Sequence, residues 1–184
     1  MGDNYDRRQE ADRSDLDMEV HPELGPTSVS DLRGKTILSV NDGAKIGSID
    51  EVLIDPDSLR IAALVVKQGG MFDRETKLVP AKDVKKWGRD AVLVDSRDVF
   101  RSEADVPNRE RWLSASDKLK GLSIVNTEGN RLGRLDEILV DETGRITAYR
   151  VSEGSLGGSS WDIPAQSTKA LGGDVVIVEG EHRV

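Results

Sequence analysis

The chain has 184 residues, a length that allows one medium domain or two small ones. Aromatic residues make up only 4% and cysteine is absent, which excludes a disulfide framework, a thiol nucleophile and a thiolate metal site. The net charge of -8 disfavours a DNA partner and non-specific RNA binding. No apolar run approaches the roughly 20 residues that span a bilayer, and no secretory signal is visible. We therefore expect a cytoplasmic protein without a transmembrane segment.

In chain order, residues 1–28 are predicted to form a disordered acidic tail. The first thirty residues contain eight Asp or Glu and three Arg, and their apolar residues are scattered. Such a segment buries too little apolar surface to offset the entropy that is lost on ordering.

The rest of the chain contains an internal repeat. Five of nine positions are identical between Gly47–Asp55 and Gly133–Asp141, and three of the other four exchange one aliphatic residue for another. The repeat predicts a first copy at 29–95, a linker at 96–114 and a second copy at 115–184. Features that both copies keep are interpreted as structural, and function is sought where the copies differ.

Each copy contains the signals of a helical turn followed by five or six strands. Ser or Asp can cap a helix start, Gly can end the turn, and Asp-Gly between apolar runs is typical of a hairpin. Turns every 8–12 residues favour a mostly β fold with a small antiparallel barrel per copy. Short helices are predicted at Ala81–Trp87, at Ala165–Leu171 and around Asn108–Leu113. The predicted strands are Lys35–Val40, Gly47–Ile54, Arg60–Lys67, Leu78–Pro80 and Ala91–Asp95, then Leu122–Thr127, Gly133–Val140, Arg145–Ser152, Asp162–Pro164 and Val175–Glu179.

The size of each copy predicts that the two copies stabilise one another. About 65 residues provide only a limited core. We therefore expect the barrels to pack on each other, with pseudo-twofold symmetry as one arrangement and a homodimer as a further level of assembly.

Two sets of residues in register carry a family resemblance. They are Gly34, Gly43, Gly47, Asp50–Asp55, Ala63–Val66 and Leu78–Pro80, and then Gly121, Gly129, Gly133, Asp136–Asp141, Ala148–Val151, Ile163 and Pro164. This series resembles the PRC-barrel family, which includes the photosynthetic reaction centre H subunit and the ribosome maturation factor RimM. The resemblance implies β-barrels that bind macromolecular partners and have no known catalytic residues. The chain lacks the membrane-spanning helix of the H subunit and the separate N-terminal domain of RimM, so neither specific function transfers.

The residue patterns predict no catalytic, cofactor-binding or metal-binding residues. The repeated pairs Asp50-Glu51 and Asp136-Glu137 lie on predicted strands, where neighbouring side chains point to opposite faces and cannot share a substrate. The glycine-rich stretch 154–160 is not followed by the Lys and Ser or Thr of a phosphate-binding loop. His21 and His182, the only histidines, lie near the two ends of the chain.

Four cations in the first copy are candidate partner-binding residues. Lys82, Lys85, Lys86 and Arg89 surround the predicted helix, and Lys82 and Lys86 share a helix face at the i, i+4 spacing. The second copy has Gln166 and other residues there, so the barrel itself does not require this charge. The alternatives are a solvated helix face and a contact with an acidic partner or a phosphate backbone.

Three apolar residues complete the candidates. Trp161 aligns with Lys77, and an aromatic residue at such a position either anchors a partner or packs between the barrels. Met71 and Phe72 lie in a predicted loop tip, as a lid on the barrel end or as a protein contact. Trp87 is matched by Leu171 and is therefore expected in the core.

The sequence thus favours a non-enzymatic binding or adaptor module that docks on a macromolecule, with protein as the first choice of partner and no cofactor. The alternative is an RNA or ribosome maturation factor similar to RimM, with the Lys82–Arg89 cluster against phosphate. A third hypothesis is an accessory protein of a membrane-associated photosynthetic or stress assembly.

Overall fold

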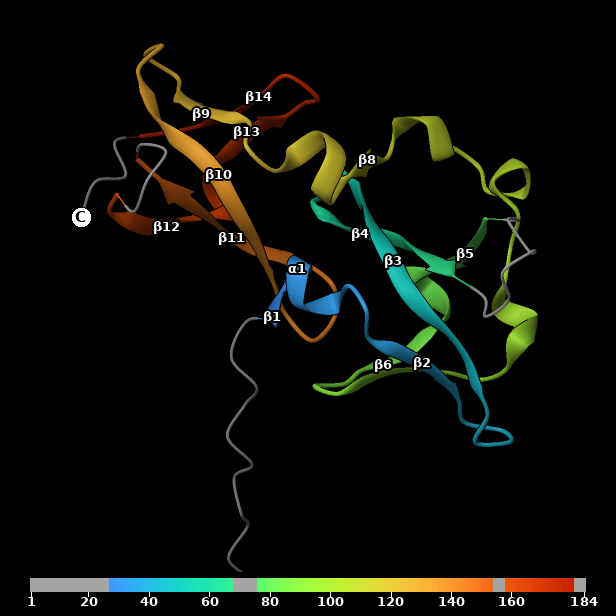
Figure 1. The fold of residues 1–184 in the computed structure, drawn as a ribbon. Helices are drawn as coiled ribbons and strands as arrows, with labels where there is room; N and C mark the ends of the chain where they lie inside the picture. Colours follow the sequence, from blue (N-terminus) through green and yellow to red (C-terminus); the bar gives the residue numbers. More distant parts are fainter. Residues whose placement is uncertain (1–26, 68–75, 154–157, 181–184) are drawn as a thin grey trace, which may run out of the picture.

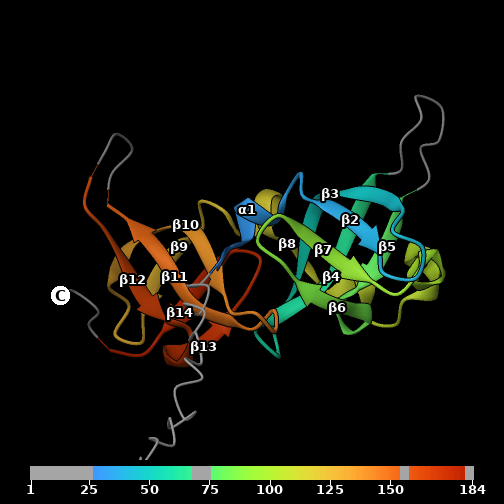
Figure 2. The same cartoon turned by 90° about the horizontal axis from the view of Figure 1, so that it is seen from below.

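The computed structural model describes residues 27–67, 76–153 and 158–180. Two β-sheet units lie side by side, and short helical turns lie between them (Figures 1 and 2). The mostly β fold with two tandem barrels, predicted from the repeat, is confirmed. No helix within these ranges is long and apolar enough to cross a membrane.

The first unit is a sheet with the strand order β5-β4-β3-β2-β7-β6. Its alternating buried and half-buried residues, as in β7, are those expected of a sheet with one face on a core. The strands are β2 (Thr36–Ser39), β3 (Lys45–Asp55), β4 (Arg60–Lys67), β5 (Lys77–Pro80), β6 (Val84–Trp87) and β7 (Ala91–Val94), with the 3-10 turn η1 (Ala81–Asp83) between β5 and β6.

The second unit repeats this topology in the order β12-β11-β10-β9-β14-β13. In both units one pair is parallel, β2 with β7 and β9 with β14. The strand pairs are otherwise antiparallel, as predicted for the two barrels, and the exception in each unit arises because the last strand returns beside the first in the same direction. The strands are β9 (Ser123–Asn126), β10 (Arg131–Val140), β11 (Ile146–Ser152), β12 (Ser160–Pro164), β13 (Thr168–Leu171) and β14 (Val175–Val178), with η6 (Ala165–Ser167) after β12.

The predicted helix at Ala81–Trp87 is wrong beyond its first turn. Residues 81–83 form η1, but Val84–Trp87 form β6 and pair with β7. The second copy differs from its predicted helix in the same way, since Thr168–Leu171 form β13. A seven-residue helix is marginal because its first turn is costly to form, whereas a strand pairs at once with an existing sheet edge.

Residues 96–114, called the connector below, wrap along the first unit. The helix predicted around Asn108–Leu113 is a single 3-10 turn. The connector contains η2 (Arg97–Val99), η3 (Glu103–Asp105), η4 (Arg109–Arg111) and the short strand β8 (Leu113–Ser114).

The opening turn of each copy docks on the other unit. The chain begins with β1 (Thr27–Ser28) and α1 (Val29–Leu32), and β1 pairs with β10 of the second unit. Reciprocally, β8 pairs with β3 of the first unit, and η5 (Ala115–Leu119), a single wide helical turn, follows it. Thr27 and Ser28, the last two residues of the predicted tail, form β1, and the rest of that predicted segment lies outside the described residues.

A second reciprocal contact joins β4 and β11. The Ile61 N–H donates to the Gly144 carbonyl at 2.8 Å, and the Ile146 N–H donates to the Leu59 carbonyl at 2.9 Å. Leu59 and Gly144 both have positive φ, 52° and 76°. Glycine adopts this conformation without strain, whereas in Leu59 it brings Cβ too close to the following carbonyl oxygen. The Leu59 side chain packs on the core. Two mutual contacts of this kind define a pseudo-twofold relation between the units.

The main core is continuous through both units. It includes fully buried residues of each sheet, such as Val52 and Tyr149, together with Leu32 and Leu119 from the two opening turns. Trp87 is half-buried against this core, as its match with Leu171 predicts. The two units therefore share one core, which supplies the apolar burial that a single copy lacks.

Candidate functional site

Two grooves on the surface are equivalent under the pseudo-twofold relation. The first groove, about 510 Å³, is lined in the first unit by Asp55, Arg60–Ala62 and Pro80–Lys82. The second groove, about 450 Å³, is lined in the second unit by Asp141, Arg145–Thr147 and Pro164–Gln166. Ser58 lines both grooves, so the grooves meet where the turn before β4 contacts the turn before β11.

Within the described residues, the first groove has a wall that has no counterpart at the second groove. This wall comes from the connector, and it adds the lining residues Arg101, Asp105, Val106, Pro107 and Trp112. The sequence repeat did not predict this asymmetry, because the connector has no repeated counterpart. The signal that could have revealed it is the presence of large apolar residues, such as Phe100, Val106 and Trp112, in a segment that was interpreted as a linker.

The connector wall is held by backbone pairing and by a small core of its own. The Leu78 N–H donates to the Arg101 carbonyl, and the Arg101 N–H donates to the Leu78 carbonyl, both at 2.9 Å. Val106 is buried with Leu53, Ala63 and Leu78 from the sheet. The half-buried Trp112 packs on the same cluster. The wall is thus part of the folded first unit.

Three cations line the first groove, and two of them are fixed in place. The Arg60 guanidinium donates to the Thr143 carbonyl at 2.9 Å. Arg101 donates to the Asp98 and Phe100 carbonyls, and its guanidinium lies 4.0 Å from the carboxylate of Asp83. Lys82 is exposed, and no hydrogen bond or ion pair joins it to another residue of the described ranges.

The acids of the grooves are held in their turns. Ser58 Oγ donates to the Asp55 carboxylate at 2.7 Å, and the Asp57 N–H donates at 3.0 Å. At Asp141, burial raises the pKa, but hydrogen bonds from Thr143 and Arg145 outweigh it, so the pKa lies below its ordinary value. The Asp141 carboxylate therefore stays ionised, and both carboxylates accept hydrogen bonds within their turns.

The four candidate cations do not form one helix face. Lys82 alone lines the first groove, because Lys85 and Lys86 lie on β6. Lys85 pairs with Asp95, Lys86 lies 3.7 Å from Glu142 of the second unit, and Arg89 lies 3.6 Å from Asp90. The i, i+4 argument for Lys82 and Lys86 is therefore wrong, and nearby carboxylates partly neutralise three of the four charges.

The apolar candidates have different outcomes. Trp161 is half-buried and packs on the main core, and its indole N–H is buried without a hydrogen-bond partner among the described residues. A partner-binding role of Trp161 stays a prediction. Met71 and Phe72 lie outside the described residues, and their role also stays a prediction.

The repeated Asp-Glu pairs have a structural role between the units. Each lies at a β-bulge, where the regular alternation of side chains is interrupted. Glu51 accepts hydrogen bonds from Ser114 and Ser116, while Glu137 accepts from the N–H and hydroxyl of Ser30.

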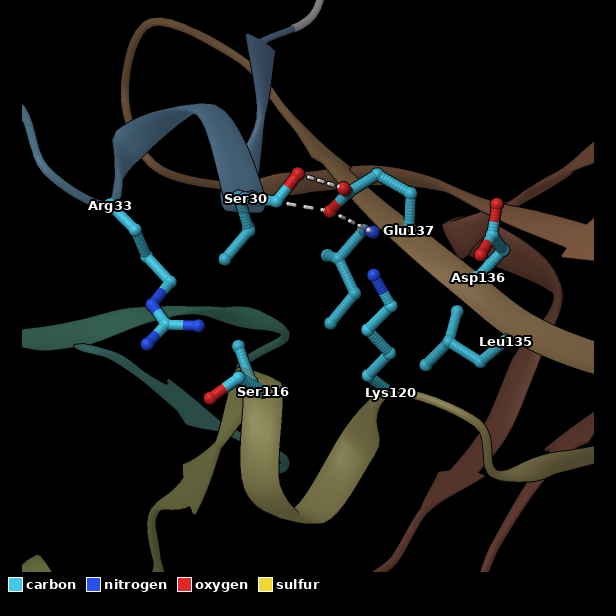
Figure 3. Close-up of a pocket in the computed structure, with 10 residues that line it drawn as sticks. Ser30, Arg33, Ser116, Lys120, Leu135, Asp136 and Glu137 are labelled. Carbon is cyan, nitrogen blue, oxygen red and sulfur yellow. Dashed lines mark hydrogen bonds between the residues drawn. The ribbon is translucent and has the colours of Figure 1, made fainter. Parts of the chain in front are cut away.

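The junction between the units encloses a small cavity of about 60 Å³ (Figure 3). Ser30 and Arg33 border it on one side and Ser116 and Lys120 on the other, and the Asp136 carboxylate is turned away from that of Glu137. This volume is far below the roughly 300–1,000 Å³ of ligand pockets. The cavity is therefore part of the joint between the units and is too small for a ligand site.

No group of three or more potential metal ligands is present in the described part of the chain. The buried Tyr149 also lacks a site role, since its hydroxyl is bonded to Thr168 at 3.1 Å inside the second unit. Burial raises the pKa of Tyr149, so this phenol is neutral at physiological pH.

Comparison with known proteins identifies similar sequences. The model of the PRC-barrel domain matches residues 27–100 and 113–182. The chain is 33% identical over 72 residues to the probable sporulation protein YlmC of Bacillus subtilis. The matched region covers 36% of this chain and 89% of YlmC. It is 24% identical over 82 residues to an uncharacterized protein of Clostridium acetobutylicum. That matched region covers 42% of this chain and 94% of the relative. Each relative is thus matched over nearly its whole length by less than half of this chain.

Proposed function

Because this chain belongs to the PRC-barrel family, with one barrel in each half, we propose that it is a non-enzymatic module that binds a protein partner in the first groove. The observation that carries this proposal is the connector wall. Equivalent strands and turns form the two grooves, and among the described residues only the first groove has a wall of apolar residues and an additional lysine. A feature that the barrel does not require is where a specific function is expected.

The chemistry of the first groove favours an extended protein segment as its occupant. Val106, Pro107 and Trp112 supply apolar area along one side, and Trp is enriched at binding hot spots. Pro80 and Ala81 of the first unit also line the groove.

The charge of the first groove favours acidic side chains on that segment. The guanidinium groups of Arg60 and Arg101 are held by hydrogen bonds to carbonyl groups, and Lys82 lies exposed at the groove. In the second groove the position of Lys82 is taken by the neutral Gln166. Complementary charge across an interface mainly adds specificity and association rate.

A matched pair of charge variants tests the proposal. The full chain, its Lys82→Glu variant and its Gln166→Glu variant are used to capture partners from the native cell, and the bound proteins are quantified by mass spectrometry. Both substitutions place a new carboxylate on an exposed position of an equivalent groove. We expect Lys82→Glu to reduce a specific protein at least about tenfold, equivalent to about 1.4 kcal/mol, and Gln166→Glu to leave it unchanged. Equal capture by the two variants would contradict the proposed site.

The same experiment separates the RNA alternative. An RNA or ribosomal partner predicts that capture is lost after nuclease treatment and falls steeply with salt. We expect capture to survive the nuclease, because Lys85, Lys86 and Arg89 lie beside carboxylates.

A further inference from the structure

The outer strands of the two units differ in what covers their free edges. In the first unit β5 is the outer strand, and the connector covers it through the two hydrogen bonds between Leu78 and Arg101. Leu78 faces Val65 of β4 but bonds to Arg101, so its N–H and carbonyl point away from β4. The equivalent outer strand of the second unit is β12.

Asp162 occupies the position of Leu78 on β12. It faces Arg150 of β11, as Leu78 faces Val65. The Glu153 N–H donates to the Ser159 carbonyl at 3.2 Å. Because bonding direction alternates along an antiparallel strand, Trp161 and Ile163 then bond to β11 and Asp162 faces outward.

No residue of the described ranges pairs with this outward edge. Within those ranges β12 pairs with β11 alone, and Asp162 is exposed. Its side chain is already satisfied by Arg150, with two contacts of 2.9 and 3.0 Å. The edge ends at Pro164, which has no N–H and whose carbonyl accepts from Ser167. A short strand edge is therefore left open at Ser160–Asp162.

A second difference lies at the start of β3 and of β10, each of which is separated from the outer strand of its unit by one strand. Ile46 on β3 is 3% exposed, whereas Leu132, its equivalent on β10, is only partly buried. In the first unit the connector turn η2 lies here, since the Arg97 guanidinium donates to the Lys45 carbonyl at 3.4 Å. The connector thus contacts the first unit at the β5 edge and at the start of β3, and the equivalent start of β10 is less buried.

We propose that the β12 edge binds an extended segment of a partner protein by strand addition, as the connector binds β5. The connector shows the chemistry that this edge accepts. Val99 and Phe100, which pack on the main core, directly precede the pairing residue Arg101. Val99 is the last residue of the 3-10 turn η2, and Phe100 is extended. The occupant is therefore a segment that is extended at the residue facing Asp162 and has an apolar pair directly before that residue. This inference rests on the proposed binding function but uses a different surface from the first groove.

Amide hydrogen exchange of the full chain tests whether the edge is open. An unpaired strand amide exchanges rapidly, and a paired one is protected by the free energy of opening. We expect the Asp162 amide to exchange at least about tenfold faster than the Leu78 amide. Equal protection would mean that the chain covers its own edge, and protection that rises with protein concentration would mean that a second copy covers it. Either result overturns the proposal.

A peptide with the sequence of residues 97–106 tests what the edge binds. Added to the labelled full chain, it should shift the NMR signals of the Ser160 and Asp162 amides and of the Trp161 indole. The Asp162→Pro substitution removes the outward N–H and should abolish these shifts. The matched control Asp162→Ala also loses the contact with Arg150 but keeps the N–H, and should retain them. Absence of shifts, or the same shifts in both variants, overturns the proposal.

The groove variant Lys82→Glu separates this inference from the proposed function. It should leave peptide binding at β12 unchanged, because Lys82 lies on the first unit. Loss of peptide binding in Asp162→Pro with intact capture by the first groove would support two independent surfaces. Loss of both in Lys82→Glu would overturn the separate edge site.

Discussion

The reciprocal docking of the opening turns predicts a strong energetic coupling between Glu51 and Ser116. Glu51 accepts hydrogen bonds from the Ser114 hydroxyl at 2.7 Å, from the Ser116 hydroxyl and from the Val52 N–H at 2.7 Å. A hydrogen bond to a charged group contributes about 1.5–3 kcal/mol, and the partial exposure of Glu51 reduces each to about 1 kcal/mol. Glu51→Ala should therefore lower the free energy of unfolding by about 2–3 kcal/mol, a large part of the ~5–15 kcal/mol of a typical domain.

A double-mutant cycle measured by urea unfolding checks this value. Ser116→Ala alone should cost about 1 kcal/mol, and the double variant should cost little more than Glu51→Ala, giving a coupling energy of about 1 kcal/mol. Asp50→Ala is the control, because its contact with Lys67 is an exposed ion pair worth about 0.2–1 kcal/mol. Additive costs of Glu51→Ala and Ser116→Ala would refute the reasoning, since the two residues would then not act across the joint.

Three further predictions concern the second unit. Gly133→Ala should lower the free energy of unfolding, measured by urea, by about 1–3 kcal/mol, because the new Cβ would lie 2.5 Å from Val151 Cγ1. Tyr149→Phe should cost about 1 kcal/mol through the lost bond to Thr168. Because burial raises the pKa of Tyr149, the neutral phenol contributes free energy of unfolding that is fully present below pH 10.0 and is lost as the pH rises through the higher folded pKa. The Tyr149→Phe variant has no phenol to ionise and should therefore lose less stability at alkaline pH. The lowered pKa of Asp141 contributes stability above pH 3.8 that is lost as the pH falls through the folded pKa, and Asp141→Asn should flatten this acid limb in a pH series of thermal melts.

The repeat was sufficient to predict the fold because both copies show the same turns and apolar runs. The mostly β class and the PRC-barrel family followed from residues such as Gly47 and Gly133, where the neighbouring strand approaches so closely that a Cβ would not fit. The helix predicted at Ala81–Trp87 was wrong at Val84–Trp87, because a segment of four residues shows too little periodicity to distinguish a helix from a strand. Pairing with β7, a contact between separate segments, decides the outcome there.

The candidate site was less predictable because it depends on the connector. Lys82 was identified from the difference between the copies and lines the first groove. Trp112 lines the same groove but was assigned to a linker. Its apolar neighbours in the sequence, Val106 and Leu113, already indicated that this segment is partly buried. Sequence alone also could not show that each opening turn docks on the other unit, because a repeat is equally consistent with two self-contained barrels.

The reciprocal joint has a consequence for synthesis of the chain on the ribosome. Ser30 contacts Glu137, 107 residues later in the sequence. At about 5–20 residues per second, the opening turn waits roughly 5 to 20 s before β10 is made. During this interval Val29 and Leu32, both buried in the finished protein, have no surface of the second unit to dock on. We therefore expect nascent chains that stop before β10 to be the form most dependent on chaperones.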